Sequence, residues 1–306
     1  MTIELPDEKS IKEKFSDIST LEHIATGGFK AVYKAEISNV TEAFKLVFIP
    51  KLEDSEEIDD GFRKENIGRI EREIAALKKC NVPELVKLGA IEPKLVSIGE
   101  KEYFAYSEEF IQGEDLFKVI KKSLKTNAPK PGEPELKLLF VALLKAIQDL
   151  WKHGYVHRDI KPCNIIKTED KKRPFVLLDL GIAFSVTDTA LTFDAQNRLP
   201  PATYRYLAPE MMDQNFRQNI DYRSDLYNTA LSVYEYACFK HPLAASQDDL
   251  VMTISRAIRQ QPVPLKNERQ DLSDDYCQLV DQMLKKKPAL RPSNIVMLIK
   301  KLEELL

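Results

Sequence analysis

Apolar and polar residues alternate in short segments over about the first third of the chain, from residue 21 onward. The segments are rich in Val, Ile, Phe and Tyr, and turn residues separate them. Alternation with a period of two and this composition predict the strands of an antiparallel sheet. The expected strands cover residues 21–25, 31–37, 43–48, 94–98 and 103–110.

One helix is expected inside this sheet region. Ile67, Ile70, Ile74 and Leu77 recur at intervals of three and four residues, so they share one helical face. Glu73 lies on the same face, and its carboxylate is therefore expected to point inward. Glu71 takes that place if the register of the helix is shifted.

Helical spacing dominates the chain after residue 113. A broad apolar stripe runs from Leu136 to Trp151, and the segment that follows Asp225 is apolar almost all round, as in a helix at the middle of a lobe. Residues 295–306 form another amphipathic helix. The whole pattern predicts an α+β protein with a sheet-containing first part and a mainly helical second part.

Length and composition describe an ordinary globular protein. A chain of 306 residues is near the size at which a single core stops growing, which favours two lobes. The net charge of −3 argues against a nucleic-acid footprint, and the four cysteines form no CxxC pair that would indicate zinc or a disulfide framework. The charged first residues carry no apolar signal region and no apolar run reaches spanning length. We expect a soluble cytoplasmic protein with neither a nucleic-acid nor a membrane partner.

Chemistry-bearing residues gather in two nearby stretches. His157 to Asn164 reads HRDIKPCN, and Leu178 to Gly181 reads LDLG after a short apolar strand. Two acids, an amide and a lysine on loops joined by a hairpin suit a metal-bound phosphate. The stretches resemble the catalytic motifs of eukaryotic-like (Hanks-type) serine/threonine protein kinases.

The resemblance implies a bilobal fold over residues 20–306. Its N-lobe would be a five-stranded antiparallel sheet with one main helix at residues 20–110, followed by the hinge and a mainly helical C-lobe at residues 111–306. Residues 1–19 are then a polar flank, or a short helix on the surface.

The same resemblance assigns the catalytic roles. Asp159 would accept or orient the proton of the attacking hydroxyl, and Lys161 would neutralise the moving phosphoryl group. Asn164 and Asp179 would hold Mg²⁺, with Mn²⁺ as an alternative ion. Lys45 would contact the phosphates of ATP, and Glu73 would be its partner. At an effective dielectric constant of about 20, such a pair at roughly 4 Å contributes about 4 kcal/mol before desolvation.

Nucleotide-binding residues follow from the resemblance as well. Residues 24–32 resemble a glycine-rich phosphate loop, in which small residues let backbone N–H groups approach the phosphates. The match is imperfect because Ala25 and Lys30 replace two glycines, and an ordinary hairpin turn is the alternative. The backbone of Glu109 and Ile111 would bind the adenine edge, and Glu108 would guard the back pocket. The full expected set is Ile24, Gly27, Gly28, Val32, Ala43, Lys45, Glu109, Ile111 and Ile166.

The segment from Asp179 to Glu210 resembles an activation segment that ends in APE. Thr203 is expected to contribute to catalysis and, with Lys161, indicates a Ser/Thr kinase. Phosphorylation of Thr189 or Thr192 is expected to raise activity through Arg158, whereas the alternative is that both are ordinary loop threonines.

Three further residues, Asp225, Arg291 and Cys163, have expected structural roles. The resemblance implies that Asp225 anchors the backbone of the catalytic loop and that Arg291 pairs with Glu210. The alternative for Asp225 is an acid at the start of a helix, where the helix dipole favours it. Cys163 is either a redox-active thiol beside the active site or a small buried filler.

Two other functions remain open. Ala25 and Lys30 suit a pseudokinase that binds nucleotide and acts as an interaction module. A small-molecule phosphotransferase with a kinase-like core is disfavoured by the APE and Thr203 segment, which would build a platform for a protein substrate. The main hypothesis is transfer of the γ-phosphoryl group of ATP to Ser or Thr hydroxyls of proteins. The sequence leaves the oligomeric state open.

Overall fold

The computed structural model describes residues 5–27, 29–50, 60–180, 184–185, 204–212, 220–245 and 247–304. These residues form two compact units. The first contains the described residues up to Lys79 together with Val86–Ile111, and the second contains Cys80–Leu85 together with those from Gln112 onward. Within the described ranges, none of the helices combines the length and apolar character that crossing a lipid bilayer requires.

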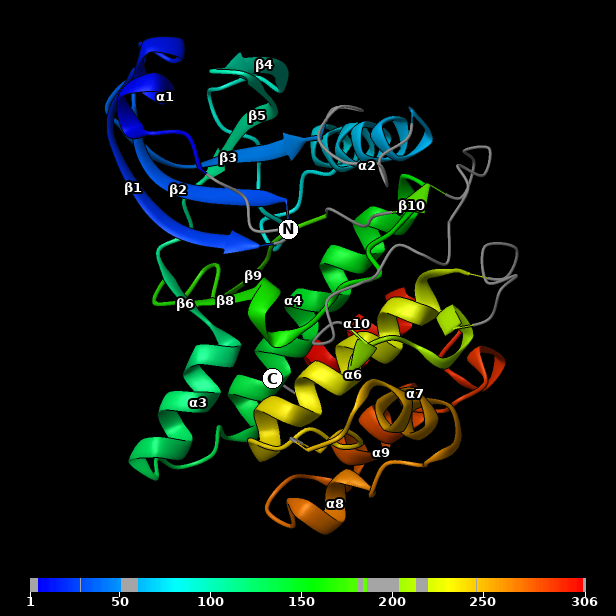
Figure 1. Cartoon of the computed structure of the whole chain (residues 1–306). Coiled ribbons are helices and arrows are strands. Elements are labelled where there is room, and N and C mark those ends of the chain that lie inside the picture. The colour runs from blue at the N-terminus through cyan, green and yellow to red at the C-terminus, as the bar shows by residue number, and fades with distance from the viewer. Residues whose placement is uncertain are drawn as a thin grey trace. The chain divides into compact units, whose positions relative to one another are not determined.

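The first unit is built on a five-stranded antiparallel sheet with the order β1-β2-β3-β5-β4 (Figure 1). The strands are β1 (Ile18–Gly27), β2 (Lys30–Ile37), β3 (Val40–Ile49), β4 (Lys94–Ile98) and β5 (Lys101–Glu109). All five predicted strands are present, and their ends differ from the predicted ones by a few residues at most.

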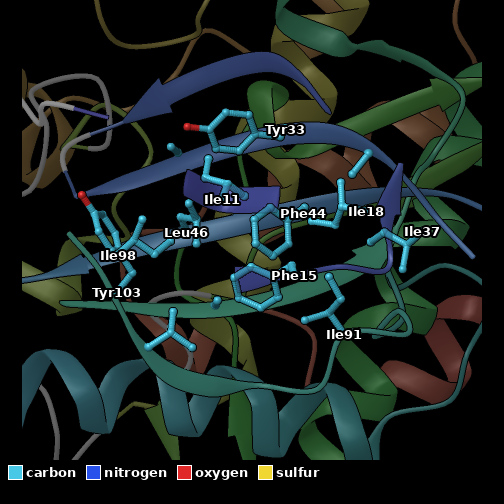
Figure 2. Close-up of a cluster of buried hydrophobic side chains, with 14 of the residues drawn as sticks. Ile11, Phe15, Ile18, Tyr33, Ile37, Phe44, Leu46, Ile91, Ile98 and Tyr103 are labelled. Carbon is cyan, nitrogen blue, oxygen red and sulfur yellow. The ribbon is translucent and has the colours of Figure 1, made fainter. Parts of the chain in front are cut away.

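A helix that precedes the sheet packs on one of its faces. α1 (Glu8–Lys14) begins at Asp7, whose carboxylate accepts a hydrogen bond from the backbone N–H of Ser10. Ile11 is fully buried, and the rings of Phe15 and Phe44 meet edge to face with centroids 5.0 Å apart (Figure 2). The sequence predicted only a flank or a short surface helix here, whereas the apolar side of α1 completes the core of the sheet.

The main helix, α2 (Asp60–Lys79), packs on the opposite face. Its Ile70 and Ile74 join a buried cluster with Phe104 and Tyr106 of β5. Side chains alternate between the two faces of a strand, so the face with Phe44 is covered by α1 and the face with Lys45 is turned toward α2. This alternation decides which polar side chains meet Glu73.

The second unit is mainly helical. α4 (Glu133–Lys152) and α6 (Tyr222–Cys238) lie side by side (Figure 1), and in α6 every residue except Arg223 is buried. The other helices are α3 (Leu116–Thr126), α7 (Leu250–Arg259), α8 (Leu265–Glu268), α9 (Asp274–Met283) and α10 (Ile295–Glu304). The predicted α+β class, with a sheet unit followed by a mainly helical one, is confirmed.

Short strands of this unit flank the loops that contain residues 157–161 and residue 179. β6 (Gly113–Asp115), β8 (Ile165–Thr168) and β9 (Phe175–Leu177) form one small sheet, and β7 (Tyr155–Val156) pairs with β10 (Phe184–Ser185). Residues 157–161 therefore lie between β7 and a 3₁₀ helix, Pro162–Asn164, that leads into β8. Asp179 follows β9 after one intervening residue, Leu178.

Candidate active site

The loop between β7 and β8 and the residues after β9 lie next to each other in the second unit. The backbone N–H of Leu178 donates to the carbonyl oxygen of Asn164 at 2.8 Å. Arg158 and Asp179 have φ angles of 70° and 61°, in the left-handed region that non-glycine residues rarely adopt. Such conformations cost free energy and gather at active sites.

Asp159, Lys161 and Asn164 form one hydrogen-bonded cluster. The ammonium of Lys161 donates to both carboxylate oxygens of Asp159, at 2.8 and 2.7 Å. The side-chain amide of Asn164 donates to the backbone oxygen of Asp159 at 2.9 Å and to its carboxylate at 3.1 Å. Three of the predicted catalytic side chains are therefore held together, with the carboxylate of Asp159 between a cation and an amide.

Burial and the ammonium of Lys161 shift the pKa of Asp159 in opposite directions. Burial raises the pKa of the Asp159 carboxyl, and the charge of Asp179 adds to the effect, while the ammonium of Lys161 counteracts it. His157 is fully buried, and burial lowers its pKa to about 4. A neutral His157 keeps its Nδ1 as an acceptor for the backbone N–H of Asp159 at 3.2 Å.

Asp225 fixes the backbone of the same loop. Its two carboxylate oxygens accept hydrogen bonds of 2.8 Å from the N–H groups of His157 and Arg158. Asp225 is fully buried near the start of α6, and burial raises its pKa to about 7 against the lowering effect of these two donors. The predicted anchoring role of Asp225 is confirmed.

Glu210, at the end of the APE motif, is held by side chains from two other parts of the second unit. Arg291 and Glu210 form a bidentate ion pair, with N···O distances of 2.6 and 2.8 Å, as predicted. Ser224 of α6 also donates to Glu210 at 2.7 Å, and the guanidinium stacks over the ring of Tyr227. These contacts tie residues 209–212 to α6.

In the first unit, Lys45 is paired with two buried acids. Its ammonium lies 3.7 Å from Glu73, the predicted partner, and 2.5 Å from Glu108 of β5. The side chains of both glutamates are only 3% exposed. Glu71, the alternative to Glu73, is exposed. The contact with Glu108 was not expected.

Two of the residues predicted to contact the adenine, Val32 and Ala43, share the face of Lys45. Strand pairing places Val32 opposite Lys45 and Ala43 opposite Glu108, and side chains of directly paired residues lie on one face. Ile24 lies at an irregularity between β1 and β2 and is 45% exposed. The structure therefore places Val32, Ala43 and Lys45 together and leaves Ile24 on the surface.

The predicted phosphate loop is the hairpin between β1 and β2. Gly27 pairs with Lys30 across it, and a Cβ atom added at Gly27 would meet no atom within 4 Å. Packing therefore does not require glycine here, whereas close approach of a phosphate would. Gly28, Thr189, Thr192 and Thr203 lie outside the described residues.

The remaining predicted contacts lie at strand ends. Glu109 is the last residue of β5, and its N–H donates to the carbonyl oxygen of Lys87 at 2.9 Å. Ile111 is half-buried at the end of the first unit, and Ile166 is half-buried on β8 of the second. Their contact with adenine stays a prediction.

The oxygen donors in the second unit suit a divalent ion. Asn164 and Asp179 offer amide and carboxylate oxygens, which Mg²⁺ and Mn²⁺ prefer. The charge of Asp179 helps to raise the pKa of Asp159, so a cation at Asp179 would relieve repulsion between the two carboxylates.

Cys80, Asp149 and His153 form another group with metal-binding side chains. Their ligand atoms lie within 4.8 Å of one another. However, His153 Nδ1 is 2.9 Å from the carbonyl oxygen of Asp149, and the Asp149 carboxylate accepts from the N–H of Asn81 at 2.8 Å. These bonds give the group a structural role, because they connect the end of α4 to residue 81.

Comparison with known proteins decides the family. The family model described as the protein kinase domain matches residues 18–302, nearly the whole chain. The chain belongs to the protein kinase family. Relatives of this kinase domain include a probable serine/threonine-protein kinase of Clostridium perfringens, which is 24% identical over 93% of this chain and 38% of its own length.

Two other relatives also match the chain over only part of their own length. Serine/threonine-protein kinase PknB of Mycobacterium leprae is 26% identical over 73% of this chain and 33% of its own length. Dual specificity mitogen-activated protein kinase kinase mek-1 of Caenorhabditis elegans is 31% identical over 51% of this chain and 42% of its own length. The chain thus spans less than half the length of these three relatives. The resemblance to Hanks-type serine/threonine kinase domains is confirmed.

The sequence did not predict the contact of Glu108 with Lys45, and it led to a wrong expectation for the exposure of Cys163. The link from Glu108 to Lys45 depends on the pairing of β3 with β5, which joins residues 63 positions apart. Cys163 is exposed, so the expectation of a buried filler was wrong.

Proposed function

We propose that this kinase domain transfers the γ-phosphoryl group of ATP to Ser or Thr hydroxyls of protein substrates. The observation that carries the proposal is the cluster of Asp159, Lys161 and Asn164 on a loop that Asp225 anchors. Serine/threonine kinases among the relatives support the class of acceptor.

Each side chain of the cluster has one task in this reaction. Asp159 accepts or orients the proton of the substrate hydroxyl, and its raised pKa makes the carboxylate a stronger base than that of an exposed aspartate. Lys161 leaves Asp159 for the oxygens of the transferring group as negative charge builds there. Asn164 and Asp179 hold Mg²⁺ or Mn²⁺, which supplies charge neutralisation at the phosphates when bound.

The first unit provides the binding of the nucleotide. Lys45 contacts its phosphates, and Val32 and Ala43 contact the adenine on the same face of the sheet. The open surroundings of Gly27 leave room for a phosphate beside the backbone. Ile166 and the backbone of Glu109 and Ile111 complete the adenine contacts.

The proposal extends to regulation and location. Phosphorylation of Thr189 or Thr192, with Arg158 as the partner of the phosphate, raises activity, and full activity of the Thr189→Ala, Thr192→Ala double variant would exclude this part.

The proposed location of the domain is the cytoplasm. Its four free cysteines agree with a reducing compartment.

The position of a transferred label tests the proposed class of function. The protein is incubated with γ-labelled ATP and Mg²⁺, alone and with a generic protein acceptor. We expect label on the serine or threonine residues of protein. Nucleotide-dependent thermal stabilisation without any label would support the pseudokinase alternative instead. Label on a small metabolite alone would exclude a protein substrate.

A further inference from the structure

Lys45 donates its hydrogen bond to Glu108, although Glu73 lies on the facing helix. The Nζ to Oε1 distance is 2.5 Å for Glu108 and 3.7 Å for Glu73, and the second value exceeds hydrogen-bond length. Lys45 is 6% exposed, so its ammonium is largely shielded from water. The lysine expected to meet the nucleotide is therefore already bound within its own unit.

Strand register produces this contact. Lys45 is directly opposite Tyr106, and Ala43 is directly opposite Glu108, so Lys45 and Glu108 are diagonal neighbours on one face of the sheet. Diagonal neighbours are within reach of long side chains. The small side chain of Ala43 leaves space over which Lys45 can reach Glu108, and the ammonium also lies 5.4 Å from the centre of the Tyr106 ring.

Glu108 depends on Lys45 for a charged partner, because the ammonium lies 2.5 Å from its buried carboxylate. A carboxylate that loses its cation while buried is strongly destabilised. If the phosphates of a nucleotide take Lys45, Glu108 loses its hydrogen bond while a further anion approaches. Both effects oppose the binding of a polyphosphate.

We propose that Glu108 sets the nucleotide affinity of this kinase domain by competing with the phosphates for Lys45. In the free domain Lys45 is bound to Glu108, and on nucleotide binding it moves to the phosphates and to Glu73. Glu108 acts through Lys45 and is not a catalytic residue. The inference rests on the proposed function, because it takes Lys45 as the phosphate-binding lysine.

Removal of the Glu108 charge tests the inference. The Glu108→Gln variant keeps the shape of the side chain, and Glu108→Met removes its hydrogen-bonding groups as well. Glu102→Gln is the matched control, since it makes the same change six positions earlier on β5, where Glu102 pairs with Arg63 at 2.7 Å. Dissociation constants for ADP and ATP with Mg²⁺ are measured by calorimetry, together with KM for ATP, kcat and Tm.

We expect Glu108→Gln and Glu108→Met to bind both nucleotides about tenfold more tightly than wild type, and the decrease in KM for ATP to exceed any change in kcat. The Glu102→Gln variant should bind as wild type does. Unchanged or weaker binding by folded Glu108 variants would overturn the inference, because Glu108 would then merely support Lys45.

The two proposals can fail separately in this experiment. Tighter nucleotide binding without phosphoryl transfer by any variant would preserve the inference and overturn the proposed kinase activity. Phosphoryl transfer by wild type, together with nucleotide affinities that are unchanged in the Glu108 variants, would support the proposed kinase activity and overturn the inference. Absence of nucleotide binding in every folded variant would overturn both.

Discussion

The carboxylate of Asp225 accepts a hydrogen bond of 2.8 Å from the backbone N–H of His157, 68 positions earlier in the chain. Its other oxygen accepts from the next N–H, that of Arg158, at the same distance. The strained conformation of Arg158, with φ at 70°, is thus supported by a buried acid on α6. These two hydrogen bonds therefore hold the loop that carries Asp159 in place against α6.

We predict that Asp225→Asn weakens both the fold and the catalytic loop. An amide presents one oxygen and one NH₂ group, so one of the two backbone donors would lose its acceptor. The expected loss is about 2–4 kcal/mol in the free energy of unfolding, with at least tenfold lower activity of the protein that remains folded. Denaturation at pH 8 measures it, since the carboxylate is ionised there. Asp170→Asn, on the exposed turn before β9, is the control. Equal unfolding free energies for the two variants would contradict the anchoring role.

The domain should lose stability in acid through two buried histidines. Burial lowers the pKa of His157 to about 4 and that of His241 to about 3, and unfolding restores a value near 6.5. The unfolded chain therefore binds more protons between these values, so the stability present above pH 6.5 is lost as the pH falls toward 4. At most, His157 contributes roughly 3 kcal/mol and His241, whose contribution is lost down to about pH 3, roughly 5 kcal/mol.

His241 provides the variant for this test. Its Nδ1 accepts from the N–H groups of Leu243 and Ala244 at 3.1 and 2.8 Å, and protonation would remove that acceptor. The Asn side chain of His241→Asn keeps an acceptor and cannot be protonated. We expect a smaller decrease of the unfolding free energy between pH 7 and pH 4.5 than in wild type. The same pH dependence in both proteins would show that His241 does not contribute.

Arg291 should not tolerate lysine. A single ammonium replaces the bidentate contact with Glu210 and loses the donors to the carbonyl oxygens of Arg223, Lys285 and Lys286. We expect Arg291→Lys to lower the free energy of unfolding by about 3 kcal/mol. Arg259→Lys at the exposed end of α7 should change it by less than about 0.5 kcal/mol. Chemical denaturation compares the two variants, and a free energy of unfolding of Arg291→Lys equal to that of wild type would contradict the role of the buried pair.

Much of this arrangement could be predicted because it is local in sequence or follows from motifs. The alternation of residues predicted the five strands, and the spacing of Ile67, Ile70 and Ile74 placed Glu73 on the inner face of α2. The family resemblance of the helix start at Asp225 and of the late Arg-Pro pair led to the contacts of Asp225 and Arg291.

Other contacts depend on how distant segments pair. Glu108 meets Lys45 only because of the register between β3 and β5, which no local pattern reveals. The burial of Ile11 likewise requires the open face of the sheet to be present. In both cases the tertiary fold determines what the side chain touches.

Gly27 should matter to the nucleotide and not to the fold. A Cβ at Gly27 meets nothing within 4 Å, so Gly27→Ala should change the free energy of unfolding by less than about 0.5 kcal/mol. A methyl group beside a bound phosphate should still raise the KM for ATP. A Cβ at Gly113 would lie 2.2 Å from the carbonyl oxygen of Lys167, so Gly113→Ala should cost about 2 kcal/mol or more. An unchanged KM in Gly27→Ala would place the phosphates elsewhere.

The rate of phosphoryl transfer to protein by wild type and by Asp159→Asn tests the central claim most directly. The exposed Asp170→Asn variant serves as the control, and all three proteins are compared at matched folded concentration with saturating ATP and Mg²⁺. The account predicts that Asp159→Asn loses at least about a hundredfold in rate, since general-base catalysis contributes about 10²–10⁴-fold, and that Asp170→Asn stays within about twofold of wild type. Equal rates for wild type and Asp159→Asn would contradict it.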